Sequence, residues 1–149
     1  MGCAIFPNLS MYLAMALHIR DLRHSDRAGL SRLRESARRI GPLSAPDPGA
    51  HVLVGQRDGV LAGAIWLTLT GNSATLPVVL VESSASWQSD ICELIAEACL
   101  WLASRGAARI DLQVRPEDSE LLEGLLEMDF KLDPSGFVLR RLIPSRTAA

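Results

Sequence analysis

The sequence predicts a single α+β domain, in which a mostly antiparallel mixed sheet carries helices on both faces. Three observations support this fold class. Two stretches have the apolar spacing of amphipathic helices, three consecutive stretches read as strands joined by short turns, and further strand-like stretches lie towards both ends of the chain. Strands and helices in this order are typical of layered domains. The chain of 149 residues has the usual length of one domain.

The first residues, 1–15, form an apolar arm that is expected to be loosely ordered or packed on a partner. The arm lacks a basic leader and a proline interrupts it, so neither a signal peptide nor a membrane span is predicted. The single domain is expected over 16–149, and its first strand over 16–22, where apolar and polar residues alternate. Ser25 is a suitable N-cap for a helix over 26–40, which Gly-Pro ends.

Three strands are predicted next, at 51–56, 60–70 and 74–83. The first two are joined by an Asp-Gly dipeptide, which is favoured in two-residue hairpin turns. Pro77 lies inside the third strand. Because proline has no N–H for the ladder, a bulge or a break in pairing is expected there.

A second amphipathic helix is predicted from about residue 89 to 104. Asp90 and Glu93 have the spacing of a capping box at its start. Its core-facing stripe is expected to consist of Ile91, Leu94, Ile95, Ala98 and Leu102. A strand over 108–114, a short helix within 115–130 and a closing hairpin complete the chain.

Composition limits the classes of function. The net charge of −2 gives no reason to expect binding to nucleic acid or to an anionic membrane. No His, Cys and Asp spacing suggests a metal site. The three cysteines are too few for a disulfide framework, and Cys92 and Cys99, about 10 Å apart on one helix, are expected to be buried apolar residues of a cytoplasmic protein. Three arginines at 27, 34 and 38 would share one helix face, either as a ridge for an anion or partner or as a solvated face.

Three stretches carry a resemblance to a known family, and they keep its order and spacing. They are "LHIRDLRHSDRAGLSRL", "RDGVLAGAIWLTL" and "LASRGAARIDLQVRPEDSELLEGLLEMDFKL". From Leu17 to Ile143 the chain resembles the GNAT superfamily of acyl-CoA-dependent N-acyltransferases. The resemblance implies that an acyl-CoA lies where the strand ending at Val81 splays from the strand through Ile110.

The turn before the second helix departs from the family. There the pattern is Arg/Gln-x-x-Gly-x-Gly/Ala, whose backbone N–H groups hold the CoA pyrophosphate. This chain has Ser86, Ser89 and Ile91 at those positions, with Trp87 and Asp90 between them. A carboxylate at a helix start is expected to repel a pyrophosphate. The resemblance still implies that acetyl-CoA or another acyl-CoA is bound by a group of residues around this turn, namely Val81, Ser83, Ser86, Trp87, Gln88, Ser89, Asp90 and Ile91.

The catalytic positions depart as well. Leu125 stands where the family often has a tyrosine acid, and leucine cannot donate a proton. Asp118 stands where the family has asparagine. The candidate bases are Glu82, which lies at the end of the strand predicted at 74–83, and His51, which opens the strand predicted at 51–56.

Two functions from different classes therefore stay open. One is N-acyl transfer, most simply acetyl transfer, to a primary amine of a small molecule or protein. The other is an inactive GNAT-fold module for binding or regulation, whose cleft is closed by Trp87 and Ile91. Such a module would assemble with another protein or with a second copy through its apolar arm.

Overall fold

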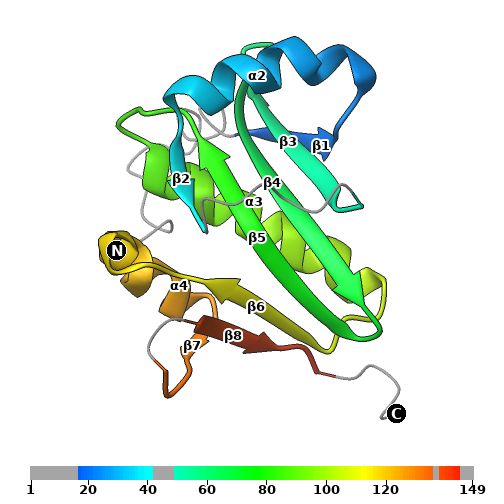
Figure 1. Cartoon of the computed structure of the whole chain (residues 1–149), viewed down its shortest axis with the longest axis vertical. Helices are drawn as coiled ribbons and strands as arrows, with labels where there is room; N and C mark the ends of the chain where they lie inside the picture. Colours follow the sequence, from blue (N-terminus) through cyan, green and yellow to red (C-terminus); the bar gives the residue numbers. More distant parts are fainter. Residues whose placement is uncertain (1–16, 42–48, 136–137, 145–149) are drawn as a thin grey trace, which may run out of the picture.

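The computed structural model describes residues 17–41, 49–135 and 138–144, so the predicted arm at 1–15 lies outside the described residues. Its strands form one sheet in the order β1-β3-β4-β5-β6-β8-β7, and β2 also pairs with β5 (Figure 1). The strands are β1 His18–Asp21, β2 Arg38–Ile40, β3 His51–Arg57, β4 Val60–Thr70, β5 Ser73–Val81, β6 Arg109–Gln113, β7 Lys131–Leu132 and β8 Val138–Leu142. The helical elements are η1 His24–Asp26, α2 Arg27–Ser36, α3 Trp87–Ser104, η2 Pro116–Leu121 and α4 Leu122–Glu127.

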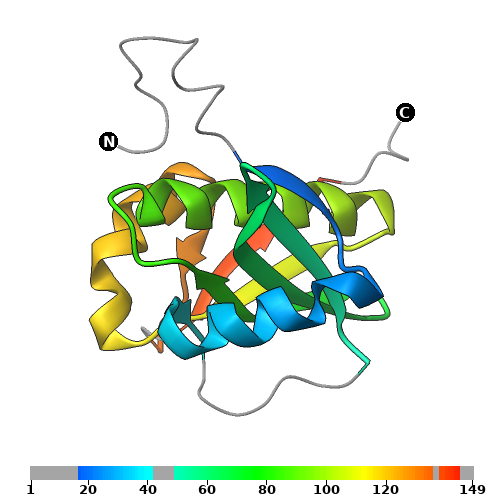
Figure 2. The same cartoon turned by 90° about the horizontal axis from the view of Figure 1, so that it is seen from above.

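The predicted fold class is confirmed, because the sheet is mostly antiparallel and has helices on both faces. Among the described strands, only β5 and β6 pair in parallel. Figure 2 shows α2 on one side of the sheet and α3 with α4 on the other. Each side has its own apolar core: Leu33 of α2 packs with Val54 and Trp66, while the predicted stripe of α3 is buried in the larger cluster. Within the described residues, no helix is long and apolar enough to cross a membrane.

The local turn signals of the sequence are also confirmed. Asp58 and Gly59 join β3 to β4 with φ of 55° and 77°, the left-handed conformations that a type I′ hairpin turn requires. In the next hairpin the register shifts between Trp66 and Thr68, which pair with Val78 and Thr75. One residue of β4 therefore faces two of β5, so the bulge expected at Pro77 is present.

The first helix ends earlier than predicted. The helix α2 stops at Ser36, and Arg38–Ile40 form the strand β2. The apolar spacing of Leu33, Ala37 and Ile40 suits a helix, but Ile40 instead reaches the core, where it is 1% exposed. Tertiary pairing with β5 has overridden the local pattern. Consequently Arg38 does not share a helix face with Arg27 and Arg34, which are exposed on α2.

The strand β5 has different neighbours along its two halves. Beside β6 it pairs at Ser73, Ala74 and Thr75 only, after which the two strands diverge (Figure 1). On the same side, its last residues pair with β2, with Val79 opposite Ile40 and Val81 opposite Arg38. The divergence leaves room for a site at the C-terminal end of β5, next to the start of α3.

Candidate functional site

The divergence of β5 from β6 lies where the family resemblance places an acyl-CoA. The edge of β5 that such a ligand would meet is covered by β2 over three residue pairs, Val79 to Val81. A cavity of about 200 Å³ remains beside β2. It is bounded by β2, by the first turn of α3, and by η2 together with the residue that precedes η2. The residues that line it are Arg38, Arg39, Ile40, Trp87, Ile91, Arg115, Asp118 and Leu121.

The turn between β5 and α3 is shaped by its serines. Ser84 accepts hydrogen bonds at its carbonyl from the N–H of Trp87 (3.3 Å) and at its hydroxyl from the N–H of Ser86 (3.3 Å). The N–H of Asp90 donates to the carbonyl of Ser86 at 2.9 Å. Within the described part of the chain, the N–H groups of Gln88 and Ser89 have no acceptor. Two first-turn donors therefore remain for an anion.

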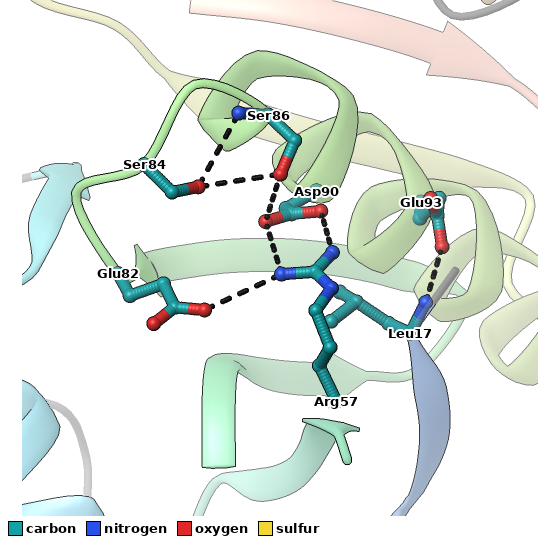
Figure 3. Close-up of polar contacts among 7 residues, drawn as sticks. All are labelled: Leu17, Arg57, Glu82, Ser84, Ser86, Asp90 and Glu93. Atoms are coloured by element: carbon teal, nitrogen blue, oxygen red, sulfur yellow. Dashed lines mark hydrogen bonds and ion pairs between the residues drawn. The ribbon is translucent and has the colours of Figure 1, made fainter. Parts of the chain in front are cut away.

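Asp90 has a different role from the one predicted. Its carboxylate is 1% exposed and forms an ion pair with Arg57 of β3, with 2.6 Å between Oδ1 and Nη2 (Figure 3). It also accepts a hydrogen bond from the Ser86 hydroxyl at 3.3 Å. Arg57 compensates the negative charge, so the expected repulsion of a pyrophosphate is largely removed. The hydrogen bonds that Arg57 donates to Asp90 raise the pKa of Arg57 above its ordinary value.

The capping box predicted from Asp90 and Glu93 is not formed. The helix begins two residues earlier, at Trp87, and its N-cap is Ser86. Glu93 instead accepts a hydrogen bond from the backbone N–H of Leu17 at 3.1 Å, which ties the start of the described chain to α3 (Figure 3). Burial raises the pKa of Glu93.

Trp87 is the first residue of α3 and helps to line the cavity. Its ring is half-buried, packs against the larger core cluster, and lies under the guanidinium of Arg38 at 3.9 Å. Ile91, one turn further along α3, is fully buried. The turn has neither the glycines nor the basic residue of the family pattern. These contacts instead place the aromatic face of Trp87 and the guanidinium of Arg38 beside it.

The two candidate bases lie apart. Glu82 follows β5 directly, its side chain is 44% exposed, and one carboxylate oxygen lies 3.3 Å from Arg57. His51 is at the far end of β3 from Arg57, where it bonds Asp21 at 2.9 Å and stacks on Trp101 at 4.2 Å. It does not line the cavity. Of the two, Glu82 is the one that the structure brings next to the turn, whereas Ser83 beside it bonds the carbonyl of Ser36 at 3.4 Å.

Two residues after β6, Asp118 and Leu125, stand where the family has functional residues, and here both contribute to packing or to an ion pair. Leu125 is 1% exposed in the core. Asp118 is buried and pairs with Arg115 at 3.2 Å, and Arg115 also donates to the carbonyl of Arg39 at 2.7 Å. The contribution of Arg39, Arg57 and Arg115 to the site was not predicted from the sequence. No local spacing signals it, because Arg57 meets Asp90 across 33 positions and Arg115 meets Arg39 across 76.

Among the described residues, no group of three or more His, Cys, Asp or Glu side chains is placed to hold a metal ion. The two cysteines in α3, Cys92 and Cys99, are buried, as predicted, and form no disulfide within the described residues. Cys3 lies outside the described residues.

Comparison with known proteins gives the fold a name. No family profile and no curated protein matches the sequence. Solved structures do match, among them the ribosomal-protein-S18-alanine N-acetyltransferase of Escherichia coli, with a TM-score of 0.72 and 15% identity over 89% of this chain and 99% of that one. The PaiA N-acetyltransferase of Thermoplasma acidophilum, in complex with coenzyme A, matches with a TM-score of 0.67 and 16% identity over 87% of this chain and 100% of that one.

A GNAT family acetyltransferase of Brucella melitensis, in complex with acetyl-CoA, matches with a TM-score of 0.65 and 20% identity over 87% of this chain and 89% of that one. These structural neighbours are acetyltransferases, and two of the three were solved with coenzyme A or acetyl-CoA. At such low identity the likeness establishes the fold rather than the substrate. The chain has the fold of the GNAT superfamily.

Proposed function

We propose that the protein is an acyl-CoA-dependent N-acyltransferase that transfers an acyl group, most simply acetyl, to a primary amine of a small molecule or protein. The observation that carries the proposal is the divergence of β5 from β6 beside the first turn of α3, where the N–H groups of Gln88 and Ser89 are available. The acetyltransferases that share the fold support the same reaction class.

The residues around the turn are suited to an anionic carrier. The amide groups of Gln88 and Ser89 would face its phosphates, and the aromatic face of Trp87 would pack on its arm. Arg57 neutralises Asp90 at 2.6 Å, so the turn carries no uncompensated charge at that point. The acyl-CoA can reach the edge of β5 at Val81 only after β2 has left that edge.

In the reaction we propose, an acyl-CoA supplies the acyl group as a thioester. Glu82 accepts a proton from the substrate ammonium, directly or through a water molecule, which leaves the neutral amine that attacks; Glu82 is accessible for this because its side chain is 44% exposed. A bond forms between the amine nitrogen and the acyl carbon, the bond from that carbon to sulfur breaks, and the proton that the nitrogen loses passes through water to the thiolate. Correct positioning of the two reactants supplies about 7 kcal/mol or more of the rate enhancement.

Calorimetric titration with acetyl-CoA, followed by thiol release assayed with a panel of polyamines, aminoglycosides and peptides, tests the proposal. We expect acetyl-CoA to bind and at least one class of amine to release free thiol. If acetyl-CoA binds neither the natural chain nor a variant whose β2 is displaced, the proposal is wrong.

Replacement of the candidate base gives a second test. Glu82→Gln should lower kcat about 100-fold, the lower end of the effect of general base catalysis, and should leave the affinity for acetyl-CoA unchanged. Glu97→Gln is the matched control, because Glu97 is an exposed carboxylate of α3 outside the cavity. Equal activity of the two variants would remove Glu82 from the mechanism.

One observation favours a second candidate, a non-catalytic binding module. The edge of β5 at Val79 to Val81 is already paired with β2, and Trp87 lines the cavity that remains. Such a module would bind a partner in the cytoplasm, another protein or a second copy, and would not turn over acetyl-CoA. Binding of acetyl-CoA without thiol release for any amine would favour this candidate.

A further inference from the structure

We propose that the cavity between β2, the start of α3 and η2 is a binding site for a small multivalent oxyanion, a phosphate or a dicarboxylate, which holds β2 on β5. The second part of the inference, that this ligand competes with acyl-CoA, rests on the proposed function. The first part does not depend on it, because the charge and the shape of the cavity carry it.

Among the described residues that line the cavity, arginines outnumber carboxylates. Three arginines, Arg38, Arg39 and Arg115, face one carboxylate, that of Asp118. Asp118 is committed to Arg115 at 3.2 Å. Arginine side chains present planar sets of N–H donors that match phosphate and carboxylate groups in pairs. A cavity of this composition selects an anion.

Arg38 is the arginine best placed to bind one. Its guanidinium lies 3.9 Å above the ring of Trp87, a contact that uses the face of the group and leaves its in-plane donors for a ligand. Among the described residues, no carboxylate pairs with Arg38. Arg38 is itself exposed, so a ligand can reach these donors from solvent.

The size of the cavity restricts the ligand. Its volume of about 200 Å³ is below the ~300–1,000 Å³ that is typical of pockets for drug-sized ligands. A phosphate or a short dicarboxylate fits such a space, whereas a complete acyl-CoA does not. The size of the cavity therefore favours a small anion over a complete acyl donor.

The cavity exists only while β2 is docked, because Arg38, Arg39 and Ile40 form one of its walls. The same strand covers the β5 edge at Val79 to Val81 that an acyl-CoA would need. A ligand that binds the docked state and not the undocked one must shift the population towards the docked state. By linkage, the oxyanion and acyl-CoA weaken each other's binding.

The first experiment measures anion binding directly, by calorimetric titration of the full chain with inorganic phosphate and with malonate, each at ionic strength matched with sodium chloride. Arg38→Gln should weaken the affinity about tenfold, the loss expected for one charge-assisted hydrogen bond. Arg32→Gln removes an exposed arginine of α2 outside the cavity and should bind as the natural chain does. Binding of phosphate alone assigns the site to phosphates, and binding of malonate alone assigns it to dicarboxylates.

The anion site is refuted if neither anion binds, or if the two arginine variants bind equally well. The second experiment repeats an acetyl-CoA titration with saturating anion, which should weaken acetyl-CoA binding to the natural chain. Unchanged acetyl-CoA affinity refutes the competition and leaves the anion site in place. If acetyl-CoA binds no form of the protein while the anion binds, the proposed function fails and the site stands.

Discussion

Replacement of Gly41 by alanine should release β2 and open the cleft. Gly41 follows β2, has φ of 109°, and lies so close to β5 that an added Cβ would stand 2.1 Å from the carbonyl oxygen of Pro77. Real Cβ atoms do not approach backbone oxygens so closely, so the end of β2 must move. The left-handed backbone alone costs a residue other than glycine about 1–3 kcal/mol. We take about 2 kcal/mol as the destabilisation of the docked state.

The effect on acyl-CoA binding follows from this figure. If the natural chain must undock β2 before it binds, its apparent Kd is the intrinsic Kd divided by the small undocked fraction. A shift of about 2 kcal/mol raises that fraction about 30-fold, so calorimetry should show acetyl-CoA binding about 30-fold more tightly to Gly41→Ala. Gly71→Ala is the control, because Gly71 has φ of 63° in the turn from β4 to β5 and nothing lies within 4 Å of its added Cβ. Equal acetyl-CoA affinity in all three proteins would refute β2 as the barrier.

Two further predictions concern the buried carboxylates. Asp90→Asn should lower the free energy of unfolding, measured in urea, by about 2 kcal/mol, because it removes a charged hydrogen bond with Arg57 at a side chain that is 1% exposed. Asp21→Asn, at a side chain that is 67% exposed, should change this free energy by less than about 0.5 kcal/mol. Equal losses in the two variants would contradict the role of burial. The hydrogen bond from Arg20 lowers the pKa of Asp26 from 3.8 to about 2. The contribution of Asp26 to stability is therefore complete above pH 4 and is lost as the pH falls towards 2. In acid titrations of the melting temperature, Asp26→Asn should therefore show a smaller fall in stability over this range than the natural chain. Asp58→Asn, in the exposed β3–β4 turn, should show the same fall as the natural chain.

The parts of the fold that the sequence predicts well are those whose signals are local. Asp58 and Gly59 impose their own turn geometry, and Pro77 imposes its bulge, whatever lies around them. The stripe of α3 repeats over many residues and was recognised for the same reason. These elements do not depend on a distant partner.

The elements that were missed depend on distant partners. A strand of three residues such as β2 is too short to show an alternating pattern, and its pairing with β5 is set by the divergence of β5 from β6. The carboxylate of Asp90 has the spacing of a cap in the sequence, but Arg57 from β3 captures it. The candidate site combines both kinds of information: the turn that a family pattern identified, and a set of arginines that only the folded chain brings there.

The pairing of β2 with β5 has a consequence for the solubility of the protein. Where two strands of a sheet diverge, each presents an edge of unpaired N–H and C=O groups, which is a template for pairing with another chain. Here β2 covers that edge at Val79 to Val81, in the part of β5 where Val79, Leu80 and Val81 are all buried and apolar. A form of the protein in which β2 is undocked therefore exposes an unpaired, apolar strand edge. Unless a ligand covers that edge, self-association and aggregation would begin from this form.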